Sequence, residues 1–246
     1  MKKLSIVLLV FGLFIAKSSF AQDDSGELKN FRFGLKVQPS LAWYKPDDAK
    51  NFQSFGTKLK FSYGLMTEFR LSKVACFSTG LEMNSTGGGI KYLDTAYYKP
   101  SGDTNKFFVD TRTFKANYVD IPITLKMKTP EIGTLTYFGQ FGVNASIRWN
   151  AKTTDHGHLI TSPTMLDQGP TVATKEVGFI QLGLNIGGGF EMNLAGTTSF
   201  TVSINYHNGF TNALRGESKV LLDKTGTAVK QNVKAKCVSL SIGILF

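Results

Sequence analysis

Cysteine is scarce in this chain of 246 residues, which contains only Cys76 and Cys237. This number is too small for an exported domain held together by a framework of disulfides. Beyond the first residues no run of 18 apolar residues occurs, which excludes a membrane-spanning helix there. Basic residues outnumber acidic ones but are dispersed, and no recognition motif accompanies them, so nucleic acid is not an expected partner.

The N-terminal residues 1–21 have the pattern of a secretory signal peptide. Lys2 and Lys3 are followed by a short apolar stretch, and small residues precede a cleavage site before Gln22. Without Lys2, Lys3 and Lys17, 25 of the 28 Lys and Arg remain against 18 Asp and Glu, a net charge of +7. We therefore expect an exported, basic chain, with a short periplasmic segment at 22–30 and one domain at 31–246.

Apolar and polar residues alternate in eight segments of the remaining chain, as they do in strands whose faces meet different surroundings. The last of these, 233–246, has Val238, Leu240 and Ile242 on one face and small residues such as Ser239 and Ser241 on the other. The eight segments are about 31–44, 57–71, 74–92, 114–128, 134–150, 175–193, 198–209 and 233–246.

The connections between these segments alternate in length. Those after the second, fourth and sixth are short, whereas those at 45–56, 93–113, 151–174 and 210–232 are long and polar. This alternation is typical of periplasmic turns and extracellular loops. The predicted fold is an all-β, eight-stranded antiparallel up-and-down transmembrane β-barrel in the outer membrane of a Gram-negative bacterium, with both termini in the periplasm. The eighth strand should close the ring against residues 31–44 and 198–209.

A soluble barrel of the lipocalin kind also alternates, with its apolar residues inside. Here most charged residues of the strands share a face with Gly and Ser, while aromatic residues gather at the strand ends of the opposite face, as in membrane girdles. The interior of such a small barrel is filled by side chains, so we expect a lumen plugged by ion pairs. The charged residues expected there are Arg32, Lys36, Lys58, Lys60, Glu68, Arg70, Glu82, Asp120, Lys126, Arg148 and Glu191.

Cys76 and Cys237 also fall on the inward face, on the third and eighth strands. A disulfide is chemically allowed in an exported chain. Different depths on strands that are not neighbours argue against one. The alternative is that both are small residues that fill the lumen.

The stretch from Tyr118 to Lys126, YVDIPITLK, resembles a strand motif of PorT-like outer-membrane β-barrel proteins of Bacteroidetes. The glycine-rich 183–194, the run 205–212 and the terminal Ile244-Leu245-Phe246 are also similar. The resemblance implies an OmpA/OmpX-type barrel without a catalytic residue, possible partners in type IX secretion, and a terminal Phe246 that the barrel assembly machinery reads. Tyr118, Asp120 and Pro122 are the motif residues. We expect Asp120 to pair with a lumen Lys or Arg, and Pro122 to mark a bulge or local break because it lacks a ladder donor.

Few residues suggest chemistry. Asp155-His156-Gly157-His158 could hold a metal, but no further ligand accompanies it, and a solvated loop is the alternative. His207 and Ser203 share a face without a hydrolase motif around them. We expect no catalytic residue, no metal and no cofactor.

The sequence therefore favours a non-enzymatic barrel that serves as an envelope scaffold or a secretion-associated component. The alternatives are a small porin or ligand-binding barrel and, in another class, a lipid-modifying enzyme. Expected partners are outer-membrane lipid and lipopolysaccharide, the barrel assembly machinery and secretion-apparatus proteins.

Overall fold

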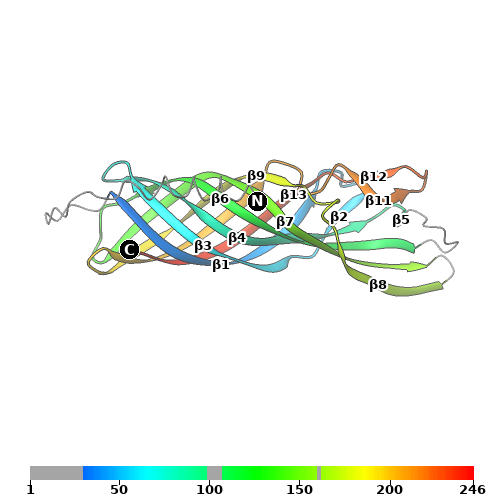
Figure 1. Ribbon diagram of the computed structural model, residues 1–246, viewed down its shortest axis with the longest axis horizontal. Helices are drawn as coiled ribbons and strands as arrows, with labels where there is room; N and C mark the ends of the chain where they lie inside the picture. Colours follow the sequence, from blue (N-terminus) through cyan, green and yellow to red (C-terminus); the bar gives the residue numbers. More distant parts are fainter. Residues whose placement is uncertain (1–29, 99–106, 160–161) are drawn as a thin grey trace, which may run out of the picture.

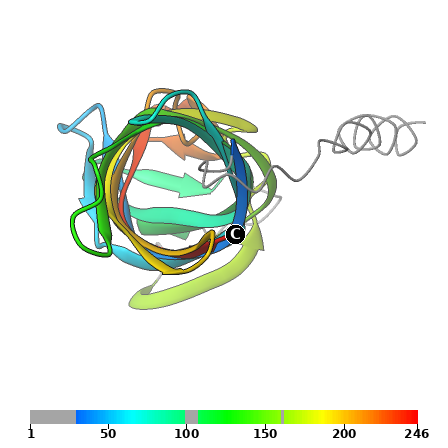
Figure 2. The ribbon, with the colours of Figure 1, turned by 90° about the vertical axis from the view of Figure 1, so that its left-hand side faces the viewer.

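Eight long antiparallel strands form a closed ring in the computed structural model, which describes residues 30–98, 107–159 and 162–246 (Figures 1 and 2). The expected signal peptide lies outside the described residues. The ring order is β6-β4-β3-β1-β13-β10-β9-β7, and β7 pairs with β6 to close it. The strands are β1 (Phe31–Pro46), β3 (Lys58–Arg70), β4 (Ala75–Tyr92), β6 (Phe107–Lys128), β7 (Leu135–Leu159), β9 (Ile180–Ala195), β10 (Thr198–Gly209) and β13 (Val233–Leu245). The predicted eight-stranded antiparallel barrel is confirmed.

The closing strand β13 lies between β1 and β10, as expected. Gly34 is opposite Leu245 on one side, and Ser199 is opposite Leu245 on the other. The start of β1 and the end of β13 therefore lie at the same end of the barrel, here named the terminus end; the opposite end is the loop end (Figure 1).

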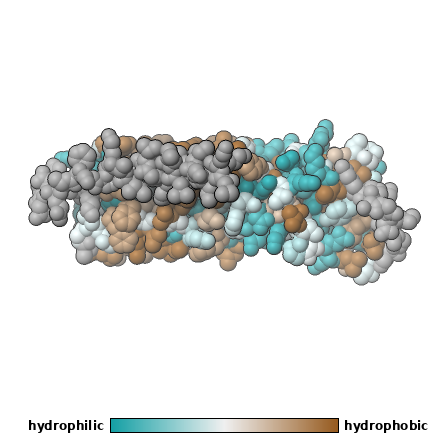
Figure 3. Space-filling view, viewed as in Figure 1, coloured by the Kyte–Doolittle hydropathy of each residue, from teal (hydrophilic) through white to brown (hydrophobic). Residues whose placement is uncertain are grey.

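The alternation sorts the side chains as predicted. On β1, Leu35 is 58% exposed, while the neighbouring Gly34 is buried and Lys36 is half-buried. Apolar side chains gather over the terminus-end part of the barrel, and hydrophilic ones over the loop end (Figure 3). An outward apolar band of this kind is what a lipid-embedded barrel requires. None of the described residues belongs to a helix long and apolar enough to span a membrane.

The long connections at the loop end are folded, which the sequence did not indicate. They contain β2 (Phe52–Phe55), β5 (Ala96–Tyr98), β8 (Ser162–Val172), β11 (Glu217–Asp223) and β12 (Ala228–Lys230). β6 and β7 also extend beyond their predicted ends. There β5 pairs with β6, and β8 pairs with β7. The barrel wall thus continues into a sheeted extension, here called the cap (Figure 1).

Pro122 interrupts the hydrogen-bond ladder between β4 and β6 without forming a bulge. The pairing of β4 with β6 keeps one register from Thr79 opposite Ile123 to Glu82 opposite Asp120, but the pairs between them are missing. Of the two alternatives expected at Pro122, a bulge or a local break, the local break is present. The register shifts of β6 lie instead on the side of β7, between Val109 and Thr111 and between Asn117 and Tyr118. A proline can be accommodated by losing ladder bonds alone when both strands keep their residue count.

Candidate functional site

Glycines that face the lumen leave room inside the barrel for the larger side chains of neighbouring strands. A Cβ on Gly187 would collide with Oδ1 of Asn205. A Cβ on Gly189 would collide with the carbonyl oxygen of Val202. These positions therefore require glycine for reasons of space.

Five charged side chains from four strands meet inside the terminus end, in a group here called the terminus cluster. Arg32 Nη2 lies 2.5 Å from Glu68 Oε2 and 3.0 Å from Glu191 Oε2. Lys126 Nζ lies 2.6 Å from Glu68 Oε1 and also contacts Glu191. Lys128 Nζ reaches the two carboxylates at 2.9 and 2.8 Å.

Every charged group of the terminus cluster has a partner of opposite charge within the cluster. Three cations surround two carboxylates, and the side chain of Lys126 is only 4% exposed. Its Nζ also lies 3.8 Å from the ring centroid of Phe138, a cation–π contact. Buried charges are tolerated when they are paired and hydrogen-bonded in this way. Lys128 was not among the expected lumen charges, although it shares the inward face of β6 with Lys126.

A smaller polar layer lies midway along the lumen. Lys36 Nζ lies 2.6 Å from Glu82 Oε1. Asn84 donates to Asp120 at 2.6 Å, and the other carboxylate oxygen of Asp120 has no partner. The expected ion pair between Asp120 and a lumen Lys or Arg is not formed in the part of the chain described, because Lys36, the lysine of this layer, is engaged by Glu82.

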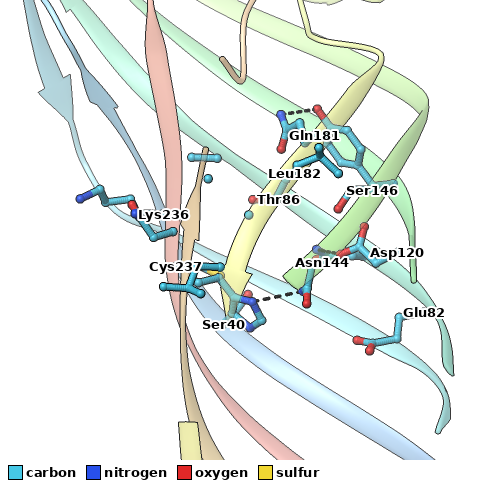
Figure 4. A pocket seen from close by; sticks show the side chains of 18 of the residues that line it. Ser40, Glu82, Thr86, Asp120, Asn144, Ser146, Gln181, Leu182, Lys236 and Cys237 are labelled. Carbon is cyan, nitrogen blue, oxygen red and sulfur yellow. Dashed lines mark hydrogen bonds between the residues drawn. The ribbon is translucent and has the colours of Figure 1, made fainter. Parts of the chain in front are cut away.

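A cavity of about 60 Å³ lies beside this layer (Figure 4). Asp120, Asn144 and Ser146 line one side of it, and Ser40 and Cys237 line another (Figure 4). A volume of this size holds water molecules rather than an organic ligand.

The loop end contains a second buried polar group, here called the cap network, which sequence reasoning missed. Arg112 is 2% exposed, and its Nε donates to Asp155 Oδ1 at 2.9 Å. Its Nη1 lies 3.6 Å from Glu176 Oε2, which accepts from Ser218 at 2.7 Å. Tyr98 donates to Asp155. The pKa of the Tyr98 hydroxyl is raised, most by burial and next by the nearby carboxylate of Asp155. The network thus joins β6 and β7 to β5, β11 and the segment before β9.

An apolar core surrounds the cap network and fills the loop end of the lumen. Tyr44, Ile90 and Phe114 are fully buried within it. Leu214 and Leu221 reach it from the connection between β10 and β13. The interior is therefore occupied at both ends, by ion pairs at one and by an apolar core at the other.

Besides Asp120, four of the charged residues expected in the lumen form no ion pair in the described ranges: Lys58, Lys60, Arg70 and Arg148. Arg148 instead donates to the carbonyl of Val177 and lies over the ring of Phe179. Lys58 lies 6.0 Å from the ring of Phe55. Alternation assigned these residues to the inward face but could not assign them a partner.

Of the motif residues, Tyr118 is buried and Gln181 donates to its hydroxyl at 2.7 Å. Phe246, expected to be the assembly signal, donates its backbone N–H to the carbonyl of Phe33 at 2.7 Å, and the two rings lie 5.6 Å apart. These contacts place the terminal residue on the rim of the ring beside β1.

The residues considered for chemistry are not assembled into a site. His207 lies near Ser239 Oγ at 3.3 Å and Asn144 Nδ2 at 3.3 Å, whereas Ser203 accepts from Asn205. His156 pairs with Asp167, and His158 pairs with Asp110 at 3.1 Å. Within the described ranges no three His, Cys, Asp or Glu side chains converge as metal ligands would. Cys76 and Cys237 are both free thiols.

Known proteins place this architecture in a family. Residues 20–215 match the model of the outer membrane protein beta-barrel domain. The chain belongs to this family. Family membership, the closed ring and the outward apolar band together assign this barrel to the outer membrane of a Gram-negative bacterium.

Solved structures with a similar fold share little sequence with this barrel. OprG from Pseudomonas aeruginosa is 12% identical, with a TM-score of 0.48 over 90% of this chain and 98% of its own. Neisserial surface protein A is 13% identical, with a TM-score of 0.39 and coverages of 90% and 98%. The outer membrane protease OmpT from Escherichia coli is 8% identical, with a TM-score of 0.36 and coverages of 90% and 99%. No curated protein matches the chain.

Proposed function

We propose that this protein is a sealed, non-enzymatic outer-membrane barrel that holds its cap as a rigid extracellular platform for other envelope proteins. The observation that supports it most directly is the filling of the lumen at both ends, by the terminus cluster and by the apolar core around Arg112. A protein whose pore is closed by packed side chains serves as an anchor, and its specific surface is the folded cap.

Single-channel recording in planar bilayers tests the sealed lumen. The purified barrel should give no steady, large unitary conductance steps, because water-filled passage is blocked at both ends. Steady unitary steps from the folded protein would contradict the proposal and favour the alternative of a small porin.

The finer proposal is a secretion-associated role. It is supported by the resemblance of Tyr118 to Lys126 to the PorT-like strand motif. Purification of the native barrel from its own membranes in mild detergent, followed by mass spectrometry, should recover envelope proteins in stoichiometric amounts. Recovery of the barrel alone, repeated after crosslinking in intact cells, would argue against a scaffold.

The alternatives of a ligand-binding barrel and a lipid-modifying enzyme have weaker support. The cavity of about 60 Å³ inside the lumen is small for an organic ligand. His207 has no carboxylate beside it in the described structure and is held by Ser239, Gln38 and Asn144. If the barrel were such an enzyme, His207→Ala would abolish lipid turnover; we expect turnover to be unchanged.

Assembly through the terminal residue is a further part of the proposal. Phe246 is 39% exposed on the rim beside β1, so its ring remains accessible. Deletion of Phe246 should lower the amount of assembled barrel in the outer membrane, measured as the heat-modifiable band on gels. Undiminished assembly would remove support for recognition of this residue by the assembly machinery.

A further inference from the structure

Five outward-facing lysines lie just beyond the apolar band at the loop end, in two groups. On one side of the ring Lys45 of β1 is directly opposite Lys234 of β13, and Lys236 is opposite Trp43. On the other side Lys115 of β6 is directly opposite Lys152 of β7. The ring order separates these groups by β3 and β4 in one direction and by β10 and β9 in the other.

Like charges on directly opposed residues of neighbouring strands destabilise a sheet. None of these five lysines forms an ion pair within the described ranges. Among the acidic side chains of the adjoining cap, Asp155 and Glu176 are buried around Arg112, and Asp110 pairs with His158. Lys234 Nζ donates to the backbone carbonyl of Phe210 at 2.6 Å, but no carboxylate pairs with either lysine pair within the described ranges.

Within the described ranges the lysine pairs occur at the loop end only. At the terminus end Arg32, Lys126 and Lys128 are turned into the lumen and paired, and Arg70, the last residue of β3, stands without a second lysine or arginine opposite it. At the loop end each pair adjoins a tryptophan at the edge of the apolar band, Trp43 or the 63% exposed Trp149. Tryptophan at such an edge marks the boundary between hydrocarbon and headgroups.

We propose that the pairs Lys45–Lys234 and Lys115–Lys152 bind the phosphoryl groups of the outer-leaflet glycolipid, the lipid A portion of lipopolysaccharide. A phosphomonoester dianion between two ammonium groups removes their mutual repulsion and accepts a charge-assisted hydrogen bond from each. The acyl chains of the same lipid would cover the apolar band directly below. This inference rests on the proposed function only for the orientation of the loop end toward the outside.

Binding of bisphosphorylated lipid A to the detergent-solubilised mature chain, followed by native mass spectrometry, tests the proposal. Each double substitution, Lys115→Gln with Lys152→Gln or Lys45→Gln with Lys234→Gln, should weaken binding by about tenfold or more. The matched control, Lys219→Gln with Lys230→Gln on β11 and β12, removes the same charge from the cap and should change binding by less than about twofold. Folding of every variant is checked by the heat-modifiable gel shift, and single substitutions replace any pair that does not fold.

Three results would overturn the proposal. The pair variants could bind lipid A as the native chain does, or the cap control could lose as much binding as they do, which would mean attraction by net charge alone. Phosphatidylglycerol could also bind as tightly as lipid A, which would mean that any anionic lipid suffices. Each of these results leaves the sealed lumen intact, because the conductance measurement tests that part separately.

Discussion

At the scale of single residues, the terminus cluster shows how a small barrel accommodates buried charge. Glu68 and Glu191 are each contacted by Arg32, Lys126 and Lys128, so both carboxylates are shared by three cations. Removal of one partner from a buried ion pair costs about 3–5 kcal/mol, because the charge left behind remains in a medium of low dielectric constant. The cost here should depend on which sign is removed, since cations are in excess.

We therefore expect Glu191→Gln to lower the stability of the barrel by about 3 kcal/mol, since three cations would then share Glu68 alone. Lys128→Gln is the matched control: it leaves two cations with two carboxylates and should therefore cost clearly less stability than Glu191→Gln. Urea-induced unfolding in lipid vesicles, followed by tryptophan fluorescence, measures both. Equal losses of stability in the two variants would show that the number of carboxylates does not limit the stability of the cluster.

Arg112 has the corresponding position in the cap. Arg112→Met would leave Asp155 and Glu176 buried without their cation. We expect the cap to open at a cost of about 3–5 kcal/mol while the barrel below remains folded. Limited proteolysis should then cleave within the cap, with the gel shift of the barrel retained, and Arg112→Lys should restore partial resistance. A cap that stays resistant in Arg112→Met would mean that the apolar core alone maintains it.

At the scale of strands, close approach of backbones on the inner wall decides where a side chain is allowed. β9 has Gly187 and Gly189 facing the lumen against β10. Gly139 of the neighbouring β7 faces outward instead, and a Cβ added there would have no atom within 4 Å. Glycine is therefore required at some strand positions and is only incidental at others.

Gly189→Ala should destabilise the barrel by about 1–3 kcal/mol, because the new methyl group meets the carbonyl of Val202 and the Cα of Ser203. Gly139→Ala should be neutral or stabilising by up to about 1 kcal/mol, because it restricts the unfolded chain without a clash. The temperature at which the heat-modifiable band shifts compares the two. A reversed order would mean that β9 moves freely away from β10.

At the scale of the whole molecule, the two ends of the barrel differ in their connections and in the direction of their cationic side chains. The terminus end has tight turns and inward-facing cations, and the loop end has the cap and the outward lysine pairs. In the proposed orientation the terminus end faces the periplasm, because short turns lie there in outer-membrane barrels.

Cysteine labelling in intact cells tests this orientation. Lys224→Cys in the cap should react with a membrane-impermeant maleimide, because Lys224 is well exposed at 66% of its side chain. Lys73→Cys in the turn between β3 and β4 should react only after the outer membrane is permeabilised. The native Cys76 is buried and should contribute little background, and Cys237 faces the lumen. Labelling of Lys73→Cys alone would reverse the orientation.

The sequence by itself determined the eight strands of the ring, the closure partners of residues 233–246 and the face on which the residues of these strands lie. It could do so because strand alternation is local: successive side chains point to opposite sides whatever the rest of the chain does. This is why Arg32, Glu68, Lys126 and Glu191 were correctly placed together on the inward side, and why Lys128 could have been added to them.

Only the tertiary structure decided which charges meet and what the long connections do. Alternation gives a face but no height along the barrel axis, and strand tilt and stagger set that height. Glu68 and Glu191 therefore meet Lys126 across the lumen, while Asp120 meets Asn84. The cap was missed because a register shift between Val109 and Thr111 disrupts the alternation before Arg112, and its core forms from contacts between segments distant in sequence.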